Sequence, residues 1–299
     1  MFPSFLPTEI AQLSESTSIA LAQSIEQTPI TTSLSQQSVL TTYVRQGSGG
    51  TPIVLLHGFD GSVFEFRRLL PLLAAENETW TVDLLGFGFT ERLPGISFSP
   101  DAIKTHLYYF WKTLIGKPMI LVGASMGGAA AIDFALSYPQ SVEKLVLVDS
   151  AGYTAGPNIS KFMFPPLGYL ATAFLRNPKV RQRISINAYH DQSFASLDAQ
   201  LCAALHLKSQ RWQQALIAFT KSGGYTSFGE KLSHIKQPTL ILWGKCDRIL
   251  GTGDAYKFKD AIANSQLIWI ENCGHVPHLE QPQLTAHHIL EFCQGKNPI

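Results

Sequence analysis

The chain has 299 residues, of which 45% are hydrophobic and 15% charged, so its composition is that of a globular protein and not of a disordered one. Its 23 basic and 22 acidic residues give a net charge of +1, which offers no electrostatic reason to expect a nucleic-acid partner. This length suits one large domain, or a core that carries an insertion.

Targeting and membrane-spanning signals are missing from the sequence. No Lys or Arg precedes Arg45, whereas a secretory signal needs a basic first region and a transit peptide needs arginines. No apolar run approaches the roughly 18–20 residues that a membrane span requires. We therefore expect an intracellular protein that contacts membranes only from their surface.

The cysteines are few and scattered, at Cys202, Cys246, Cys273 and Cys293. None belongs to a CxxC pair, and no metal-ligand spacing is present. Free thiols in a reducing compartment are the simpler interpretation. We therefore predict no metal site, and no glycine-rich phosphate loop points to a cofactor.

Residues 1–38 are rich in Ser, Thr and Gln, and we expect an N-terminal arm with a short amphipathic helix between Ser16 and Gln27 and otherwise irregular structure. From Val39 onward, short apolar runs predict strands. Most are continuously apolar, which is typical of strands covered by helices on both faces. The runs are Val39–Val44, Ile53–Leu56, Trp80–Leu84, Met119–Val122, Leu145–Val148, Leu240–Trp243 and Leu267–Ile270.

Helical segments alternate with these strands, and this alternation predicts an α/β fold with a mostly parallel, doubly wound sheet. The alternation breaks between residues 153 and 236, where the sequence pattern is typical of helices and predicts no strand. A loop of some 80 residues is too long for an ordinary connection. We expect a helical cap at 153–236, inserted into a core formed by 39–152 and 237–299. The predicted core helices are Val63–Leu73, Asp101–Ile115, Gly127–Ser137, Asp254–Ala263 and Leu284–Phe292.

The strongest chemical signal is the run from Gly123 to Gly128, which reads Gly-Ala-Ser-Met-Gly-Gly. It follows an apolar strand and precedes an Ala-rich helix, the setting in which G-x-S-x-G projects a nucleophilic serine from a strained turn. Glycines on both sides of Ser125 let the strand and the helix approach closely. Ser125 is the predicted nucleophile.

A serine alcohol needs a general base, and His275 is the best candidate among nine histidines. It follows the last predicted strand, where such a fold places its base. His278 is the second candidate. His57 precedes the serine, and we expect it to shape its loop by hydrogen bonding.

The acid that orients the base should lie between Ser125 and His275 in chain order. Asp247 fits, because it comes just after the strand Leu240–Trp243; Asp149, after the strand Leu145–Val148, is the alternative. The acid would hold the imidazole tautomer and stabilise the imidazolium.

An oxyanion hole requires two backbone N–H donors. We predict the N–H of Met126, directly after the nucleophile, and that of Phe59, in the loop after the strand Ile53–Leu56. Losing one such donor costs about 100- to 1000-fold in rate.

Several further short motifs are spread over roughly residues 50–293. They are His57–Ser62 with Glu65–Arg67, Thr79–Phe89, Phe110–Lys112, Ser222–Tyr225, Ile241–Gly244 and Asn272–His278. The chain resembles the α/β-hydrolase superfamily, and in these motifs it is similar to the chlorophyll dephytylases of plants and their cyanobacterial relatives. The missing transit peptide favours a cyanobacterial-type member or a mature form.

The resemblance implies a serine esterase that hydrolyses the phytyl ester of chlorophyll to chlorophyllide and phytol, beside the thylakoid membrane or peripherally attached to it. A long isoprenoid needs an apolar trench, and the cap offers Phe162, Phe164, Leu167 and Leu170 as substrate-binding candidates or as a membrane-facing patch. Packing of the cap on the core is the competing interpretation of these residues.

Two other functions fit the same residues. One is a general carboxylesterase, lipase or carbon–carbon bond hydrolase that uses the same triad. The other is a ligand receptor that has kept the triad and turns over slowly.

Overall fold

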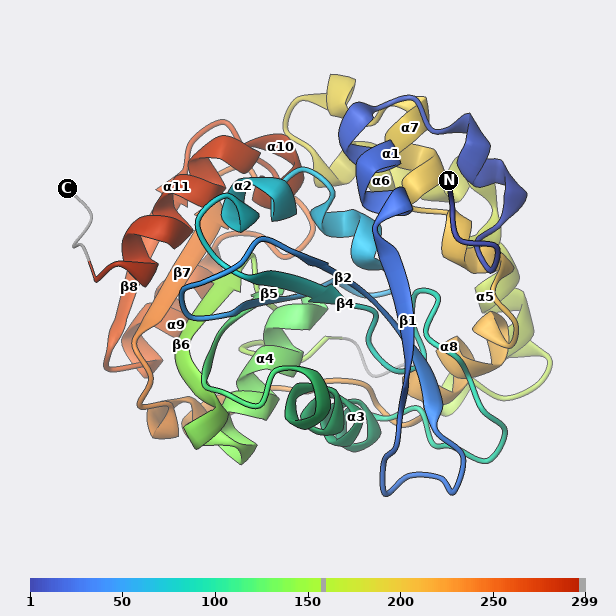
Figure 1. Ribbon diagram of the computed structural model, residues 1–299, viewed down its shortest axis with the longest axis horizontal. Coiled ribbons are helices and arrows are strands. Elements are labelled where there is room, and N and C mark those ends of the chain that lie inside the picture. The colour runs from blue at the N-terminus through green and yellow to red at the C-terminus, as the bar shows by residue number, and fades with distance from the viewer. Residues whose placement is uncertain (157–159, 296–299) are drawn as a thin grey trace.

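An eight-stranded sheet runs through the centre of the molecule (Figure 1). The computed structural model describes residues 1–156 and 160–295. The strands are β1 (Ile25–Ile30), β2 (Val39–Gln46), β3 (Ile53–Leu56), β4 (Thr79–Val82), β5 (Met119–Ala124), β6 (Val142–Val148), β7 (Thr239–Gly244) and β8 (Ser265–Ile270). They lie in the order β1-β2-β4-β3-β5-β6-β7-β8. The six strands from β4 to β8 in that order are parallel, and β1 and β2 add an antiparallel edge.

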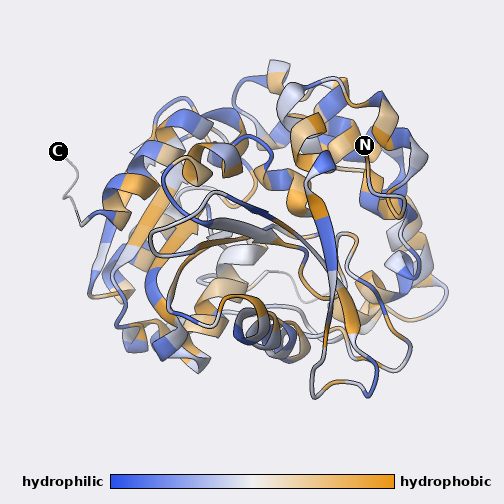
Figure 2. Ribbon diagram, viewed as in Figure 1, coloured by the Kyte–Doolittle hydropathy of each residue, from blue (hydrophilic) through white to orange (hydrophobic). Residues whose placement is uncertain are grey.

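Helices cover both faces of the sheet, which explains the unbroken apolar sequence of its central strands. In β3, Val54 and Leu56 face one hydrophobic core, and Ile53 and Leu55 face the other. Figure 2 shows β7 coloured as hydrophobic along most of its length. The first core includes residues of α3 (Pro100–Leu114), α4 (Met126–Ser137) and α9 (Gly253–Ala261), and the second includes residues of α1 (Ser16–Gln23), α2 (Leu70–Ala74) and α11 (Pro282–Cys293).

The segment between β6 and β7 is helical, and the short helix α10 (Pro277–Glu280) follows β8. The predicted cap contains α5 (Leu167–Arg176), α6 (Pro178–Ala188), α7 (Leu197–Cys202) and α8 (Trp212–Lys221), joined by 3₁₀ turns. Local sequence sets one boundary: Asn177 accepts a hydrogen bond from the N–H of Lys179, and Pro178 begins α6. Across the described residues, no helix is long and apolar enough to cross a bilayer.

The first 38 residues differ from the irregular arm that we predicted. The helix ends at Gln23, and Ile25–Ile30 forms β1, which pairs with β2. Pro29 is incompatible with a continuing helix, and the free edge of β2 supplies hydrogen-bond partners that local sequence does not reveal.

This N-terminal segment also contacts the cap, beside α6 and α7 (Figure 1). The backbone N–H groups of Ser14 and Glu15 donate to the carboxylate of Asp198 in α7, over 2.6 and 2.9 Å, and the Ser18 hydroxyl donates to its other oxygen. The carboxylate of Glu15 pairs with Arg68 in the core. The segment therefore ties the cap to the core.

Candidate active site

Ser125 lies at a sharp turn between β5 and α4, with φ 52° and ψ −119°. L-residues rarely adopt this conformation, and it persists only where the surrounding structure enforces it. Three glycines near Ser125 allow the backbone of the turn to pack closely against its neighbours, because a side chain at any of them would clash. A Cβ atom on Gly127 would lie 2.0 Å from the carbonyl oxygen of Leu56, one on Gly123 would lie 2.2 Å from the carbonyl oxygen of Gly127, and one on Gly128 would meet a neighbouring side chain at 2.0 Å.

His275 and Asp247 form a hydrogen bond of 2.9 Å between Nδ1 and Oδ2. Because a carboxylate only accepts, Nδ1 carries the proton and Nε2 is left as the basic nitrogen. The other Asp247 oxygen accepts the N–H groups of Ile249 and Leu250 at 2.7 and 3.1 Å, and the His275 N–H donates to the carbonyl of Ala188 at 2.7 Å. The acid and the base are therefore both fixed in orientation.

The predicted nucleophile and the predicted base share one cavity. Ser125 and His275 both line a space of about 330 Å³ at the carboxyl ends of the central strands. The structure thus brings together the three residues predicted as a triad, with Asp247 buried directly behind His275.

The two predicted oxyanion donors flank the nucleophile. Met126 is the first residue of α4, so its N–H lies among the unbonded donors of a helix N-terminus. In the loop after β3, the N–H of Gly58 donates to both oxygens of Glu65, at 2.9 and 3.1 Å. The adjacent Phe59 lines the cavity together with Ser125.

His57 supports this loop, which is the role expected of it. Its Nε2 accepts the N–H of Leu84 at 3.1 Å, so Nδ1 is the donor to the carbonyl of Gly58 at 2.8 Å. Burial lowers the pKa of His57 and keeps the ring neutral.

The second candidate base, His278, is buried away from the nucleophile. Its Nε2 lies 3.3 Å from a carboxylate oxygen of Glu65, and its ring packs on Phe66. It is not among the residues lining the cavity. Its place behind Glu65 is that of a residue supporting the oxyanion loop.

The alternative acid, Asp149, is fully buried and lies close to Asp247 and His275. One oxygen accepts the N–H of Gly244 at 3.0 Å, and one ligand atom each of Asp149, Asp247 and His275 lies within 4.8 Å of the others. Burial raises the pKa of Asp149 well above its usual range, and the negative charge of Asp247 raises it further. The hydrogen bond from His275 Nδ1 goes to Asp247, so the geometry favours Asp247 as the acid, and the raised pKa of Asp149 points the same way.

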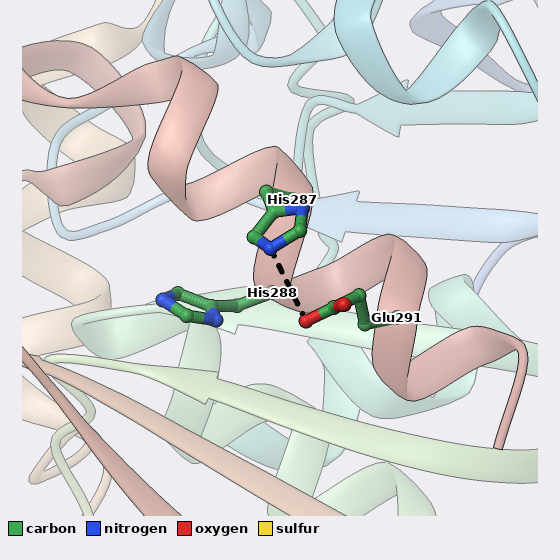
Figure 3. Close-up of side chains that lie close together, drawn as sticks. All are labelled: His287, His288 and Glu291. Atoms are coloured by element: carbon green, nitrogen blue, oxygen red, sulfur yellow. Dashed lines mark ion pairs between the residues drawn. The ribbon is translucent and has the colours of Figure 1, made fainter. Parts of the chain in front are cut away.

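Two groups within the described residues have ligand atoms near enough to hold a metal ion. The first is the cluster of Asp149, Asp247 and His275, in which the hydrogen bond of the triad occupies His275 Nδ1. The second lies on α11, where His287 pairs with Glu291 at 3.2 Å and the His288 ring extends away from that pair (Figure 3). His287 and Glu291 are one helical turn apart, which is the usual spacing of a surface ion pair.

A second cavity, of about 530 Å³, lies on the other side of Phe59. Phe59, Leu175 and Ile249 line both spaces. The second cavity also contacts Met126 and the aromatic ring of Phe219. Its walls are therefore largely hydrophobic near Phe59 and Phe219.

The four cap residues predicted to bind substrate do not line either cavity. Phe162, Phe164, Leu167 and Leu170 are 62, 49, 42 and 62% exposed, so much of each side chain is open to solvent. The neighbouring Met163 is buried and lines the second cavity, whereas substrate binding by these four residues stays a prediction.

One residue beside the oxyanion hole was missed in the sequence. Asp60 is buried, and it accepts hydrogen bonds from cap residues that lie 121 to 152 positions further along the chain. Its position next to Phe59 is the only signal that the sequence offers.

Comparison with known proteins decides the family. Residues 53–288 match the model of the alpha/beta hydrolase family. The chain belongs to the α/β-hydrolase family. The predicted fold class is confirmed, with the mostly parallel eight-stranded sheet and its helices as described.

The relatives of this hydrolase include plant and bacterial enzymes. It is 34% identical to the alpha/beta hydrolase domain-containing protein VTE7 of Arabidopsis thaliana, over 99% of this chain and 91% of the relative. It is 29% identical to a 2-hydroxy-6-oxo-6-(2'-aminophenyl)hexa-2,4-dienoic acid hydrolase of Metapseudomonas resinovorans, over 87% of this chain and 90% of the relative. A solved serine hydrolase involved in carbazole degradation, the CarC enzyme, aligns with a TM-score of 0.75 and 25% identity, over 91% of this chain and all of that one.

Proposed function

We propose that this hydrolase is a serine esterase that forms an acyl-enzyme on Ser125. The observation that carries the proposal is the hydrogen-bonded pair of His275 and Asp247, on the same cavity as a serine held in the strained turn before α4. This arrangement supplies a nucleophile, a base and an orienting acid in the order that acyl transfer requires.

The steps follow from the positions of these groups. Ser125 attacks the ester carbonyl while His275 Nε2 takes its proton, and the negative oxygen of the tetrahedral intermediate is stabilised by the N–H groups of Phe59 and Met126. His275 then protonates the leaving alcohol. Water, activated by the same imidazole, hydrolyses the acyl-enzyme and regenerates the serine.

For the substrate, we propose the phytyl ester of chlorophyll. The motif resemblance and the 530 Å³ cavity with apolar side chains such as Met163, Leu175 and Phe219 support an ester with a long isoprenoid part. The broad tetrapyrrole would lie at the mouth of the site, where Phe59 is 47% exposed.

Incubation of the purified protein with chlorophyll a in mild detergent tests this substrate, with Ser125→Ala as control and chromatography of the pigments as readout. Chlorophyllide from the wild type alone supports the proposal. If the wild type cleaves a short nitrophenyl ester and leaves chlorophyll intact, a general carboxylesterase or lipase replaces the dephytylase.

The relative named for a 2-hydroxy-6-oxo-dienoic acid favours a second candidate function, hydrolysis of a carbon–carbon bond by the same triad. Turnover of such a dienoic acid, measured as the loss of its absorbance, distinguishes this reaction from ester hydrolysis. A slow-turnover receptor would instead show a thermal shift on binding with little product formed.

We also propose that the cap docks on a lipid surface such as the thylakoid membrane. Leu167, Leu170 and Phe174 follow one side of α5 and are 42, 62 and 63% exposed. Large exposed apolar patches of this kind mark interaction sites.

The charges beside this row fit an anionic bilayer. Helices α5 and α6 carry the exposed Arg176, Lys179 and Arg183 and contain no Asp or Glu. Basic and apolar side chains together favour binding at the interface of a membrane that contains acidic lipids.

Changing Leu170 and Phe174 together to Ser is expected to reduce binding to phosphatidylglycerol vesicles at least about tenfold, since inserting one such side chain contributes about 1.5–3 kcal/mol. Co-sedimentation measures the bound fraction, and vesicles of phosphatidylcholine alone show the part due to charge. Tyr256→Ser, which removes an aromatic ring 59% exposed on α9, is the matched control. An equal loss in the control would assign the binding to some other surface.

A further inference from the structure

The carboxylate of Asp60 joins the loop after β3 to three separate parts of the cap. Its Oδ1 accepts the indole N–H of Trp212 in α8 at 2.7 Å and Nε2–H of His206, in a 3₁₀ turn, at 3.1 Å. Its Oδ2 accepts Nη1–H of Arg181 in α6 at 2.7 Å. Asp60 is therefore the point at which the cap is fastened to this loop.

Asp60 stays ionised inside this cluster. Burial by itself would raise its pKa, but the hydrogen bonds from His206 and Arg181 and the charge of Arg181 hold the pKa well below its usual range. Burial lowers the pKa of His206, so the ring is neutral and donates through Nε2. Hydrogen bonds to an ionised acceptor are about twice as strong as those between neutral groups, so this fastening is firm.

The position of Asp60 in the loop gives the cluster its chemical significance. Asp60 directly follows Phe59, the predicted oxyanion donor, and has a φ of 51°, a left-handed conformation unusual for a residue other than glycine. On the other side of Phe59, the N–H of Gly58 is held by Glu65 from the core. Both neighbours of Phe59 are therefore held by a carboxylate: Gly58 by Glu65 from the core, and Asp60 by its own side chain bound to the cap.

We infer that Asp60 is a positioning residue, which aims the N–H of Phe59 at the oxyanion and makes the oxyanion hole depend on a correctly seated cap. This inference rests on the proposed esterase function. The N–H of Gly61 donates to the carbonyl of Gly58 at 3.2 Å and closes the turn, so without the three cap donors this one backbone hydrogen bond would hold the left-handed residue, and the loop could relax. A donor displaced by a fraction of an ångström is much less effective, because the stabilisation depends on a preorganised geometry.

Asp60→Asn tests this inference because it keeps the size of the side chain and removes its charge and one acceptor. We expect kcat on nitrophenyl acetate to fall about 10- to 100-fold, less than the 100- to 1000-fold lost with a whole oxyanion donor, while KM changes less than about threefold. Affinity for a trifluoromethyl ketone, which forms a tetrahedral adduct with Ser125, should fall in parallel with kcat/KM.

Asp198→Asn is the matched control. Asp198 is also a buried carboxylate that fastens the cap, but its hydrogen bonds run to Ser14, Glu15 and Ser18 in the N-terminal segment and not to the oxyanion loop. We expect this variant to lower the melting temperature while leaving kcat and the ketone affinity within about threefold of the wild type.

Each outcome bears on a different statement. Equal loss of kcat in Asp60→Asn and Asp198→Asn, or an unchanged kcat in Asp60→Asn, overturns the positioning role. If Asp60→Asn does not fold, Trp212→Phe removes a single donor from the cluster and should still lower kcat more than KM. If the wild type lacks esterase activity, the proposed function fails and this inference fails with it. If the wild type is active, the proposed function stands, and the variants test the positioning role alone.

Discussion

Replacing Ser125 by Ala is expected to lower kcat on a nitrophenyl ester by about 10⁶-fold, leaving only the activity due to binding and the oxyanion donors. A fluorophosphonate probe, which reacts covalently with an activated serine, should label the wild type at one site and leave this variant unlabelled. Mass spectrometry of the labelled peptide identifies the residue.

The loss in Ser125→Ala should not come from misfolding. Ala shares the backbone preferences of Ser, so the turn with φ 52° is no more strained, and the circular dichroism spectrum and melting temperature should stay near those of the wild type. Full activity in a folded variant would mean that another residue is the nucleophile.

Asp247→Asn should reduce kcat by about 10⁴-fold, because an amide at this position leaves the imidazole in the wrong tautomer and its positive charge without a partner. Steady-state kinetics on the same ester measures the effect. The hydrogen bond of 2.9 Å from His275 goes to Asp247, so the loss should appear in kcat and much less in KM.

Asp149→Asn is the informative comparison for this prediction. Burial and the charge of Asp247 raise the pKa of Asp149 and so favour its neutral form, with which an amide is nearly isosteric. We therefore expect a loss below about tenfold. The reverse order of the two effects would move the acid of the triad to the end of β6.

Much of the fold follows from local sequence. The uninterrupted apolar run of Ile53–Leu56 becomes β3 with the same bounds, and Pro100 begins α3 as a proline in the first helical turn does. The strand Ile25–Ile30 was not foreseen, since its stability comes from pairing with β2 and not from its own residues.

The site divides in the same way. The grouping of Ser125, His275 and Asp247 was predictable because each residue lies in a turn or at the end of a strand. Short stretches of sequence are enough to predict turns and strand ends. Asp60 was not, since its partners come together only when the cap folds over the loop. Leu170 was predicted to bind substrate but lies outside both cavities, because the sequence of a cap helix does not show which of its apolar residues face the core.

The antiparallel edge of the sheet bears on the tendency of the protein to associate with further copies of itself. Pro29 lies opposite Leu40, whose own N–H and C=O bond to Glu91 on the inner side, so the backbone of Pro29 faces away from β2. An outer edge that lacks an N–H at this point is a poor template for another strand, and proline there protects a sheet against edge-to-edge association. Pro29→Val would restore that donor beside the β-branched Thr28, and the expected consequence is a hydrolase that aggregates more readily at high concentration.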